Sequence, residues 1–190
     1  PIVPNKINKL LTRNEKDESF FLICGRGVGA FINLEEYNFI INSALSSLRK
    51  YFKNEKIIYY PHPKERSLKL CKSIINKYEN VKIADLNYPS IDYVSRSIGV
   101  ITILSSIIFL ARAFEKKVIE YYPYKHNLKK FHPELNHKTP YSKLGFPSAR
   151  NVSDLENLIK TEFLNLSHKK KIKSIEFDDF NIEEILKKIN

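Results

Sequence analysis

The chain has 190 residues, of which 43% are hydrophobic and 28% are charged. This length allows one packed core with an extension but is too short for two full Rossmann-type domains, and the five Gly and nine Pro exclude collagen-like and low-complexity chains. The formal net charge of +11 favours anionic lipid surfaces or phosphorylated small molecules as partners. Nucleic acid is not expected as a partner, because the excess charge is largely Lys in a chain that is rich in Lys, Asn and Ile throughout.

Neither the cysteines nor the apolar segments indicate a secreted or membrane-spanning protein. Cys24 and Cys71 form no CxxC motif, and each lies in an apolar or helical pattern, so both are expected to be buried, reduced thiols. The longest charge-free stretch, residues 97–111, is shorter than the roughly 20 apolar residues that span a bilayer. The expected location is the cytoplasm, and peripheral attachment to the inner face of the cell membrane is left open.

The first part of the chain predicts a linker, a strand and a helix. Residues 1–18 are polar and flanked by prolines, which is typical of a linker or of the tail of a missing N-terminal domain. Residues 19–24 are an apolar run that predicts a buried strand, and the glycine-rich loop 25–30 follows it. Asn33 is placed to cap a helix that runs to about Phe52 with apolar side chains near the 3.6-residue period.

The same alternation of strand and helix continues to residue 122. We expect a helix opening at Pro63, a short helix capped by Ser90, and a helix from Ser105 to about Phe114. This alternation is typical of βαβ units. It predicts an α/β fold: a single Rossmann-like domain, residues 19–122, with a parallel sheet and helices on both faces. The further strands are expected at 57–60, 81–84, 99–104 and 117–121.

Beyond residue 122 the pattern becomes irregular. Residues 123–150 hold four prolines and several aromatic side chains, and we expect a long irregular connection there. Helices are expected at 152–165 and 181–189. Residues 123–190 would thus complete the domain as a loop with C-terminal helices.

The loop after the first strand has the form G-x-G-x-x-A. In a doubly wound sheet, ligands bind at the carboxyl ends of the strands, and such a loop is typical of dinucleotide binding. The dinucleotide fingerprint also requires an acid at the end of the second strand, where this chain has Tyr60-Pro61-His62. Gly25 and Gly27 therefore either form a tight turn or allow another ligand to approach the backbone.

Two further loops offer groups that suit a phosphate. Pro63 fits the first turn of a helix, which would place His62 at its N-cap, where it could donate a hydrogen bond or a proton to a phosphate leaving group. Ser105 and Ser106 follow the fourth strand directly and offer hydroxyl and backbone N–H donors, although an ordinary serine cap fits equally well. No carboxylate cluster that would hold a divalent metal is evident in the sequence, so none is expected.

The His-Pro pair and the Ser-Ser pair, each after a strand and about 40 residues apart, carry a resemblance. The sequence resembles the C-terminal, nucleotide-sugar-binding half of bacterial sialyltransferases with a GT-B fold, of the lipooligosaccharide sialyltransferase and polysialyltransferase type. The resemblance implies that CMP-sialic acid is the donor substrate and that no cofactor is needed. It also implies that His62 assists phosphate departure and that Pro63, Ser105 and Ser106 hold the CMP phosphate. Asp92 matches the acidic residue near the ribose, and Gly25 and Gly27 line the same edge.

The sequence departs from this family where the acceptor is concerned. The loop 25–30 contains no acid that could serve as general base, and the nearby Glu35 and Glu36 fit the first turn of a helix better. The acceptor, a lipooligosaccharide or capsule polysaccharide, would need a second domain. The alternatives are a GT-B transferase that uses a UDP- or GDP-sugar, and a non-catalytic module that docks on a membrane or partner through residues 169–173. A homodimer is left open.

Overall fold

The computed structural model describes residues 19–164, apart from residue 30 and residues 63–64, 66–67, 125–129, 131–132 and 134–137. The predicted linker 1–18, the Lys-rich residues 169–173, the helix expected at 181–189 and Pro63 all lie outside the described residues. No helix in the described part is long and apolar enough to cross a membrane.

The described residues form one six-stranded parallel sheet, as the alternating pattern predicted. Its strand order is β3-β2-β1-β4-β5-β6, and every neighbouring pair is parallel. The strands are β1 (Phe20–Cys24), β2 (Lys56–Tyr60), β3 (Val81–Ile83), β4 (Ser97–Thr102), β5 (Lys117–Tyr121) and β6 (Ser148–Ala149). The helices are α2 (Leu34–Tyr51), α3 (Leu68–Ile75), α4 (Ser90–Arg96), α5 (Ile107–Ala113), α7 (Pro140–Lys143) and α8 (Val152–Leu158), which continues into the π-helical η2 (Ile159–Phe163).

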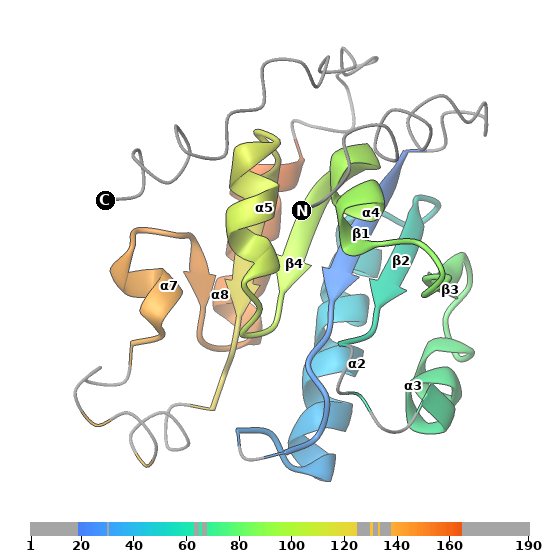
Figure 1. The fold of residues 1–190 in the computed structure, drawn as a ribbon, viewed down its shortest axis with the longest axis horizontal. Helices are drawn as coiled ribbons and strands as arrows, with labels where there is room; N and C mark the ends of the chain where they lie inside the picture. Colours follow the sequence, from blue (N-terminus) through green and yellow to red (C-terminus); the bar gives the residue numbers. More distant parts are fainter. Residues whose placement is uncertain are drawn as a thin grey trace.

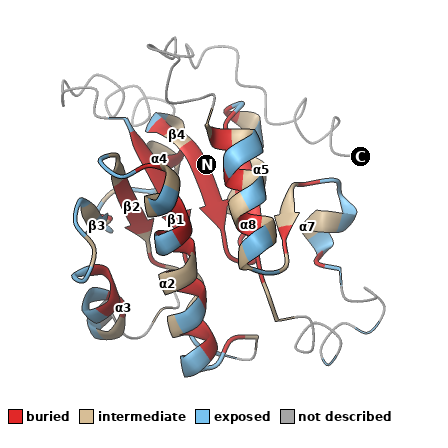
Figure 2. Cartoon of the chain, turned by 180° about the vertical axis from the view of Figure 1, so that it is seen from behind, coloured by how far each residue is buried: buried red, intermediate tan, exposed pale blue. Residues whose placement is uncertain are grey.

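Helices cover both faces of the sheet (Figure 1). One core cluster joins side chains of β1, β4 and β5 to α2, α3, α8 and η2, with Phe21 and Phe163 stacked at a centroid distance of 5.3 Å. The other cluster joins the alternate side chains of the same strands to α4 and α5. The central strands are therefore buried on both faces, whereas each helix keeps an exposed stripe (Figure 2). This two-sided burial explains why the strands were visible as continuous apolar runs.

The predicted helix caps are confirmed in part. The Asn33 side chain accepts from the Glu36 N–H, and the Glu36 carboxylate accepts from the Asn33 N–H, which completes a capping box at α2. Ser90 was expected to cap α4 but is its first residue, because Pro89 holds the cap position. Ser105 was expected to cap α5, but the cap position is Ser106, and it makes no side-chain cap bond.

The bounds of β4 and the elements of the segment 123–150 also differ from the prediction. β4 was expected at 99–104 but ends at Thr102, because the chain turns at Leu104, whose φ is +45°. The segment 123–150 is not irregular throughout: α7 begins after the Thr139 cap, and β6 extends the sheet. With only two residues, β6 shows no alternation that a sequence pattern could reveal.

The two cysteines are free thiols in opposite core clusters, as predicted. Burial raises the pKa of Cys24 well above its usual range and that of Cys71 to about 12. A thiol that stays protonated is a poor nucleophile and metal ligand. Both cysteines therefore serve as core side chains.

Candidate functional site at the carboxyl edge of the sheet

The sheet order reverses between β1 and β4. The chain runs outward from β1 to β2 and β3 and then returns to place β4 against the other side of β1. The arrowheads of β1, β2 and β4 point toward the lower part of Figure 1, and their loops leave from this edge. In open α/β sheets the crevice at such a reversal, at the carboxyl ends of the strands, is where ligands bind.

A side chain that the sequence reasoning did not single out joins the two loops of this crevice. Arg26, in the loop after β1, donates from Nη1 to the carbonyl oxygen of Leu104, in the loop after β4, at 2.8 Å. Its guanidinium also lies 4.9 Å from the centre of the Phe31 ring. A guanidinium carries five N–H donors, so Arg26 brings a positive charge and further donors to the switch point. The sequence signal for this role of Arg26 was a cationic residue between two glycines at the end of a strand.

The glycines of the loop after β1 are required by close packing. A Cβ on Gly25 would lie 1.9 Å from the hydroxyl oxygen of Tyr59, and one on Gly27 would lie 2.9 Å from the Cα of Glu65. Neither glycine has a positive φ, so close approach rather than backbone conformation explains them. Close packing against Tyr59 and Glu65 therefore explains why both positions are glycine. No local sequence pattern connects these two residues to the loop.

The loop after β2 is organised around the Glu65 carboxylate. This carboxylate accepts hydrogen bonds from the hydroxyl of Tyr37 on α2, from the hydroxyl of Tyr59 at 3.3 Å, and from the backbone N–H of His62 at 3.0 Å. The Glu65 N–H in turn donates to the His62 carbonyl oxygen at 2.7 Å. His62 and Glu65 thus form a single turn with capping-box geometry, and their spacing of three residues was the sequence signal for it.

His62 is therefore held in place by its backbone, although not as first expected. A helix was expected to open at Pro63 with His62 as its N-cap, but Glu65 is not helical and α3 is described from Leu68. The helix starts later because the turn closed by Glu65 comes between β2 and α3. The His62 side chain is half-buried at the carboxyl edge of β2.

Burial also sets the ionisation of Glu65. Withdrawal from water raises the pKa of the Glu65 carboxyl, and the hydrogen bonds from Tyr37, His62 and Tyr59 partly offset this rise. The same burial raises the pKa of both tyrosine hydroxyls, which remain protonated donors. Glu65 is consequently engaged in fixing the loop.

The two serines after β4 differ in their surroundings. Ser105 is buried, and its hydroxyl oxygen lies 3.4 Å from the Ile107 N–H, which is a long contact for a cap. Ser106 is exposed, and its hydroxyl makes no cap bond. The left-handed Leu104 precedes them, and a Leu in that conformation is held only by its surroundings, here by the bond from Arg26. The structure thus presents the Ser106 hydroxyl to solvent at this edge.

Asp92 belongs to α4, which packs against β1, β4 and α5. It occupies the first turn of α4, where burial raises the pKa of its carboxyl and Arg96 partly lowers it. The neighbouring Tyr93 ring packs against the ring of Tyr60 at a centroid distance of 5.4 Å. Asp92 thus lies near Tyr60 at the end of β2, while Ser105 and Ser106 follow β4.

A second buried carboxylate lies at the end of β5. Glu120 is fully buried and accepts hydrogen bonds from the Thr139 hydroxyl and, at 2.7 Å, from the Ser148 hydroxyl. The Arg150 guanidinium lies 3.9 Å away, and burial raises the pKa of Glu120. No local sequence pattern reveals this network, because its members come from β5, from the cap of α7 and from β6. It joins β6 to the sheet.

Three carboxylates of the described residues are thus engaged in hydrogen bonds that stabilise the fold. Glu36 caps α2, and Glu65 and Glu120 accept hydroxyl donors. Within the described residues, no group of three or more His, Cys, Asp or Glu side chains is arranged to hold a metal ion. The loops after β1 and β4 carry the Arg26 guanidinium and the exposed Ser106 hydroxyl, which are donors suited to an anion.

Comparison with known proteins bears on the fold. No protein-family model and no curated protein sequence matches the chain. Among solved structures, it is similar to the UDP-GlcNAc 2-epimerase of Methanocaldococcus jannaschii, with a TM-score of 0.54 and 15% identity over 91% of this chain and 45% of that one. It is also similar to the E. coli heptosyltransferase WaaC solved with ADP, with a TM-score of 0.51 and 13% identity over 84% of this chain and 48% of that one.

These similarities, at low identity, concern the fold alone. They agree with the predicted class: a single α/β domain with a parallel sheet that corresponds to one half of a GT-B fold. The chain spans about half the length of the solved structures that it matches. A sialyltransferase is not among the similar structures named here.

Proposed function

We propose that this domain binds a nucleotide sugar in the crevice between β1 and β4 and acts as the donor-binding half of a glycosyltransferase. The observation that carries the proposal is the Arg26–Leu104 bond of 2.8 Å, which holds a cation where the loops after β1 and β4 meet. This is the switch point of the sheet, where ligands of such folds bind. The similar M. jannaschii enzyme was solved with UDP-GlcNAc and UDP, and the heptosyltransferase with ADP, which supports a nucleotide as the ligand class.

The proposed chemistry is stabilisation of a departing phosphate. When the bond between sugar and phosphate breaks, negative charge develops on the phosphate oxygens, and fixed donors at that point lower the barrier. Arg26 would meet this charge, the Ser106 hydroxyl would donate to a phosphate oxygen, and His62 would donate a hydrogen bond or a proton. Because α5 has only seven residues, its dipole contributes less than these side chains. The proposed transfer, with inversion at the sugar carbon, needs no metal for these roles.

The donor is proposed in two forms. The resemblance of the His62-Pro63 and Ser105-Ser106 pairs to bacterial sialyltransferases favours CMP-sialic acid, or a related nonulosonic acid, as the first candidate. A UDP-, GDP- or ADP-linked sugar is the second candidate, because the similar structures contain UDP-GlcNAc, UDP and ADP. The same donors would bind the phosphate in either case, so the base preference separates the two.

The acceptor would be a glycan, and its binding would require residues outside this crevice. Glu65, which contacts the loop after β1 at Gly27, and Glu36, which caps α2, are already hydrogen-bonded within the fold. The general base that activates the acceptor hydroxyl is therefore assigned to another part of the whole protein. This agrees with a chain that covers about half of the structures that it matches.

The test is a calorimetric titration of the chain with CMP, UMP, GMP, UDP and ADP, repeated with Ser106→Ala and His62→Ala. The Ser106 hydroxyl makes no bond within the fold, so Ser106→Ala should keep the thermal stability and weaken nucleotide binding about ten-fold, the value of one hydrogen bond to a charged group. His62→Ala should weaken binding in the same direction. Ser73→Ala, which removes an exposed hydroxyl bonded to its own helix, is the matched control.

Each outcome has a distinct meaning. Preference for CMP supports the sialyltransferase-type donor, and preference for UDP, ADP or GMP supports the second candidate. Binding that is unchanged in Ser106→Ala and His62→Ala would contradict the assigned roles. No binding of any nucleotide would contradict the proposed function.

A further inference from the structure

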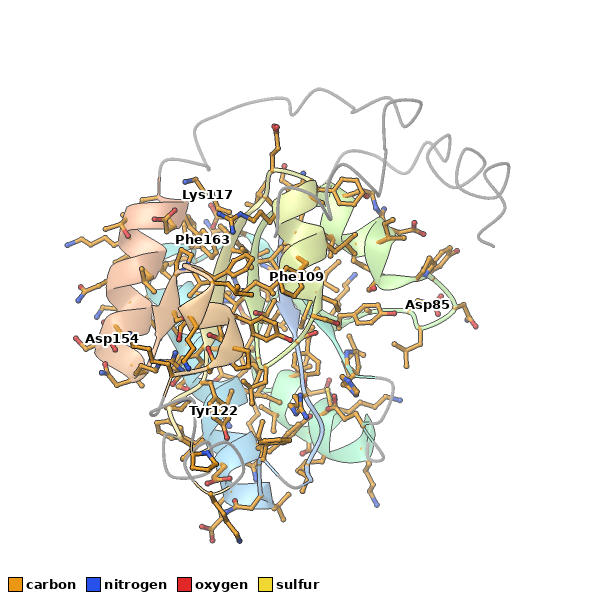
Figure 3. The ribbon with its side chains drawn as sticks, turned by 60° about the vertical axis from the view of Figure 1, so that its left-hand side comes forward. Asp85, Phe109, Lys117, Tyr122, Asp154 and Phe163 are labelled. Atoms are coloured by element: carbon orange, nitrogen blue, oxygen red, sulfur yellow. The ribbon has the colours of Figure 1, made fainter. Side chains whose placement is uncertain are left out.

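A second concave region lies at the opposite edge of the sheet. It has a volume of about 160 Å³ and is here named the basic pocket. The basic pocket lies at the amino end of β5, which begins at Lys117, whereas the crevice lies at the carboxyl ends of the strands. Figure 3 shows Lys117 above Tyr122, at the two ends of β5. Its lining includes Arg112, Lys116, Lys117, Val118, Phe146 and Glu162.

The charges of the basic pocket do not balance. Glu162, its acidic member, is paired with Lys117, and the Lys117 Nζ lies 3.0 Å from the Glu162 Oε2. Arg112 and Lys116 remain as two positive charges, and within the described residues no hydrogen bond or ion pair engages either side chain. An anion would supply the missing counter-charge.

Lys116 is the more informative of these two cations. Its side chain lies where α5 passes into β5, and only 9% of the residue is exposed. Burial lowers the pKa of its ammonium group, because the charged form is held away from water without a counter-ion. A largely buried lysine without a partner among the described residues is uncommon, because partial desolvation of its charge is unfavourable unless an anion pairs with it.

Arg112 is exposed at the same pocket and lies over an aromatic ring. Its guanidinium carbon lies 4.7 Å from the centre of the Phe146 ring, so the planar group rests on an aromatic face. A guanidinium oriented in this way presents parallel N–H donors that match two oxygens of a phosphate or carboxylate. Arg112 and Lys116 together therefore offer a bidentate fork and a point charge.

The size of the basic pocket limits what it can hold. Pockets that enclose drug-sized ligands measure roughly 300–1,000 Å³, and a water molecule occupies about 30 Å³ in the liquid. A volume of about 160 Å³ therefore cannot enclose a whole nucleotide sugar but is sufficient for a phosphate group with its hydration.

We propose that the basic pocket binds a phosphate group, as inorganic phosphate or as a phosphomonoester, held by Lys116 and Arg112. This site is separate from the crevice and does not depend on which nucleotide the crevice takes. Phe146 and the ion pair of Lys117 with Glu162 line the pocket. The pocket is open to solvent, so the ester group of a phosphomonoester can project outward.

The test is a phosphate titration of the chain, followed by thermal unfolding and by calorimetry at constant ionic strength with chloride as the reference anion. A bound anion raises the unfolding midpoint, because it binds only the folded state. Phosphate should raise the midpoint beyond chloride, and Lys116→Met and Arg112→Gln should each weaken phosphate binding at least ten-fold. Lys116→Met is expected to fold, since Met keeps the apolar stem and removes a desolvated charge.

Three controls separate the basic pocket from other sites. Lys82→Gln removes the same charge on β3, at the other side edge of the sheet, and should leave phosphate binding unchanged. Ser106→Ala weakens any phosphate bound in the crevice, so the phosphate affinity that Lys116→Met and Arg112→Gln remove should still be measured in Ser106→Ala. Methyl phosphate in place of inorganic phosphate tests whether an ester is admitted: binding of both indicates a phosphomonoester site, and binding of inorganic phosphate alone a free-anion site.

The proposal is overturned if phosphate has no effect beyond chloride. It is also overturned if Lys116→Met and Arg112→Gln bind phosphate as the unmodified chain does, or if Lys82→Gln loses as much affinity as they do. Loss of phosphate binding in Ser106→Ala alone would place the anion in the crevice. That result would overturn phosphate binding in the basic pocket and leave the proposed nucleotide site intact.

Discussion

Two loops at the carboxyl edge of the sheet are held in opposite ways. The loop after β2, of which residues 61, 62 and 65 are described, is held at Glu65 by side chains of α2 and β2 and by the His62 N–H. The loop after β4, residues 103–106, is fixed by its backbone and by one bond from Arg26, and it presents the Ser106 hydroxyl to solvent. The first loop uses its polar groups for the fold, and the second keeps one available for a ligand.

This difference separates residues that position a site from residues that bind at it. Substitutions in the network around Glu65 should change stability and, through the position of His62, any function. Substitutions of the exposed serine should change ligand binding with little effect on stability. The two loops can therefore be distinguished by measuring the free energy of unfolding and nucleotide affinity on the same variants.

The largest expected effect is that of Gly25→Ala. The added Cβ would lie 1.9 Å from the Tyr59 hydroxyl oxygen and 2.4 Å from its ring carbon, and Tyr59 is fully buried, so the loop after β1 has to move. Overpacking of this kind costs about 3 kcal/mol in free energy of unfolding, measured by urea denaturation. Gly29→Ala is the matched control, because nothing lies within 4 Å of its added Cβ. Equal losses in both variants would show that loop entropy, not contact with Tyr59, explains the glycine.

The next largest effect is that of Glu65→Ala. This change leaves the hydroxyls of Tyr37 and Tyr59 and the His62 N–H without their acceptor, which we expect to lower the free energy of unfolding by about 2 kcal/mol. Glu65→Gln retains an acceptor oxygen and removes the desolvated charge, so it should lose less. A Gln variant that is as unstable as the Ala variant would argue against hydrogen bonding as the cause.

The pH dependence of the same position follows from its burial. Because the folded state raises the pKa of Glu65 above its unfolded value of about 4.3, the folded state binds the proton more tightly. The stabilisation from this proton is present below the unfolded value and is lost as pH rises through the folded pKa. Unfolding curves at a series of pH values should therefore show the unmodified chain gaining stability relative to Glu65→Gln as pH falls through that interval. Parallel profiles would contradict this sign.

Most of the fold could be predicted from the sequence because it is built from two-sided burial. Strands such as 20–24 and 117–121 form apolar runs, and Asn33 with Glu36 follows the spacing of a capping box. β6 was missed because its two residues pair only with β5 and are fixed by the Glu120 network. That network is assembled from distant segments, so no local pattern contains it.

The candidate site was predicted less completely for the same reason. The sequence pattern located the loops after β1, β2 and β4, since strand ends and glycines are local signals. It did not show that Arg26 links two loops, nor that Tyr37 and Tyr59 hold Glu65 beneath His62. These contacts depend on which strands lie side by side, and that information is in the sheet order β3-β2-β1-β4-β5-β6.

The smallest expected effect is that of substituting Ser105 or Ser106, in the loop after β4, on the free energy of unfolding. Ser106→Ala removes a hydroxyl that makes no cap bond, and Ser105→Ala removes one whose contact with the Ile107 N–H is 3.4 Å long, so each should change the free energy of unfolding by no more than about 0.5 kcal/mol. Asn33→Ala removes a true cap, with a bond of 2.9 Å to the Glu36 N–H, and should cost about 1 kcal/mol in the same urea titration. If Ser106→Ala destabilised the chain as much as Asn33→Ala does, the serine would be a helix cap, and its availability for a phosphate would no longer follow from the structure.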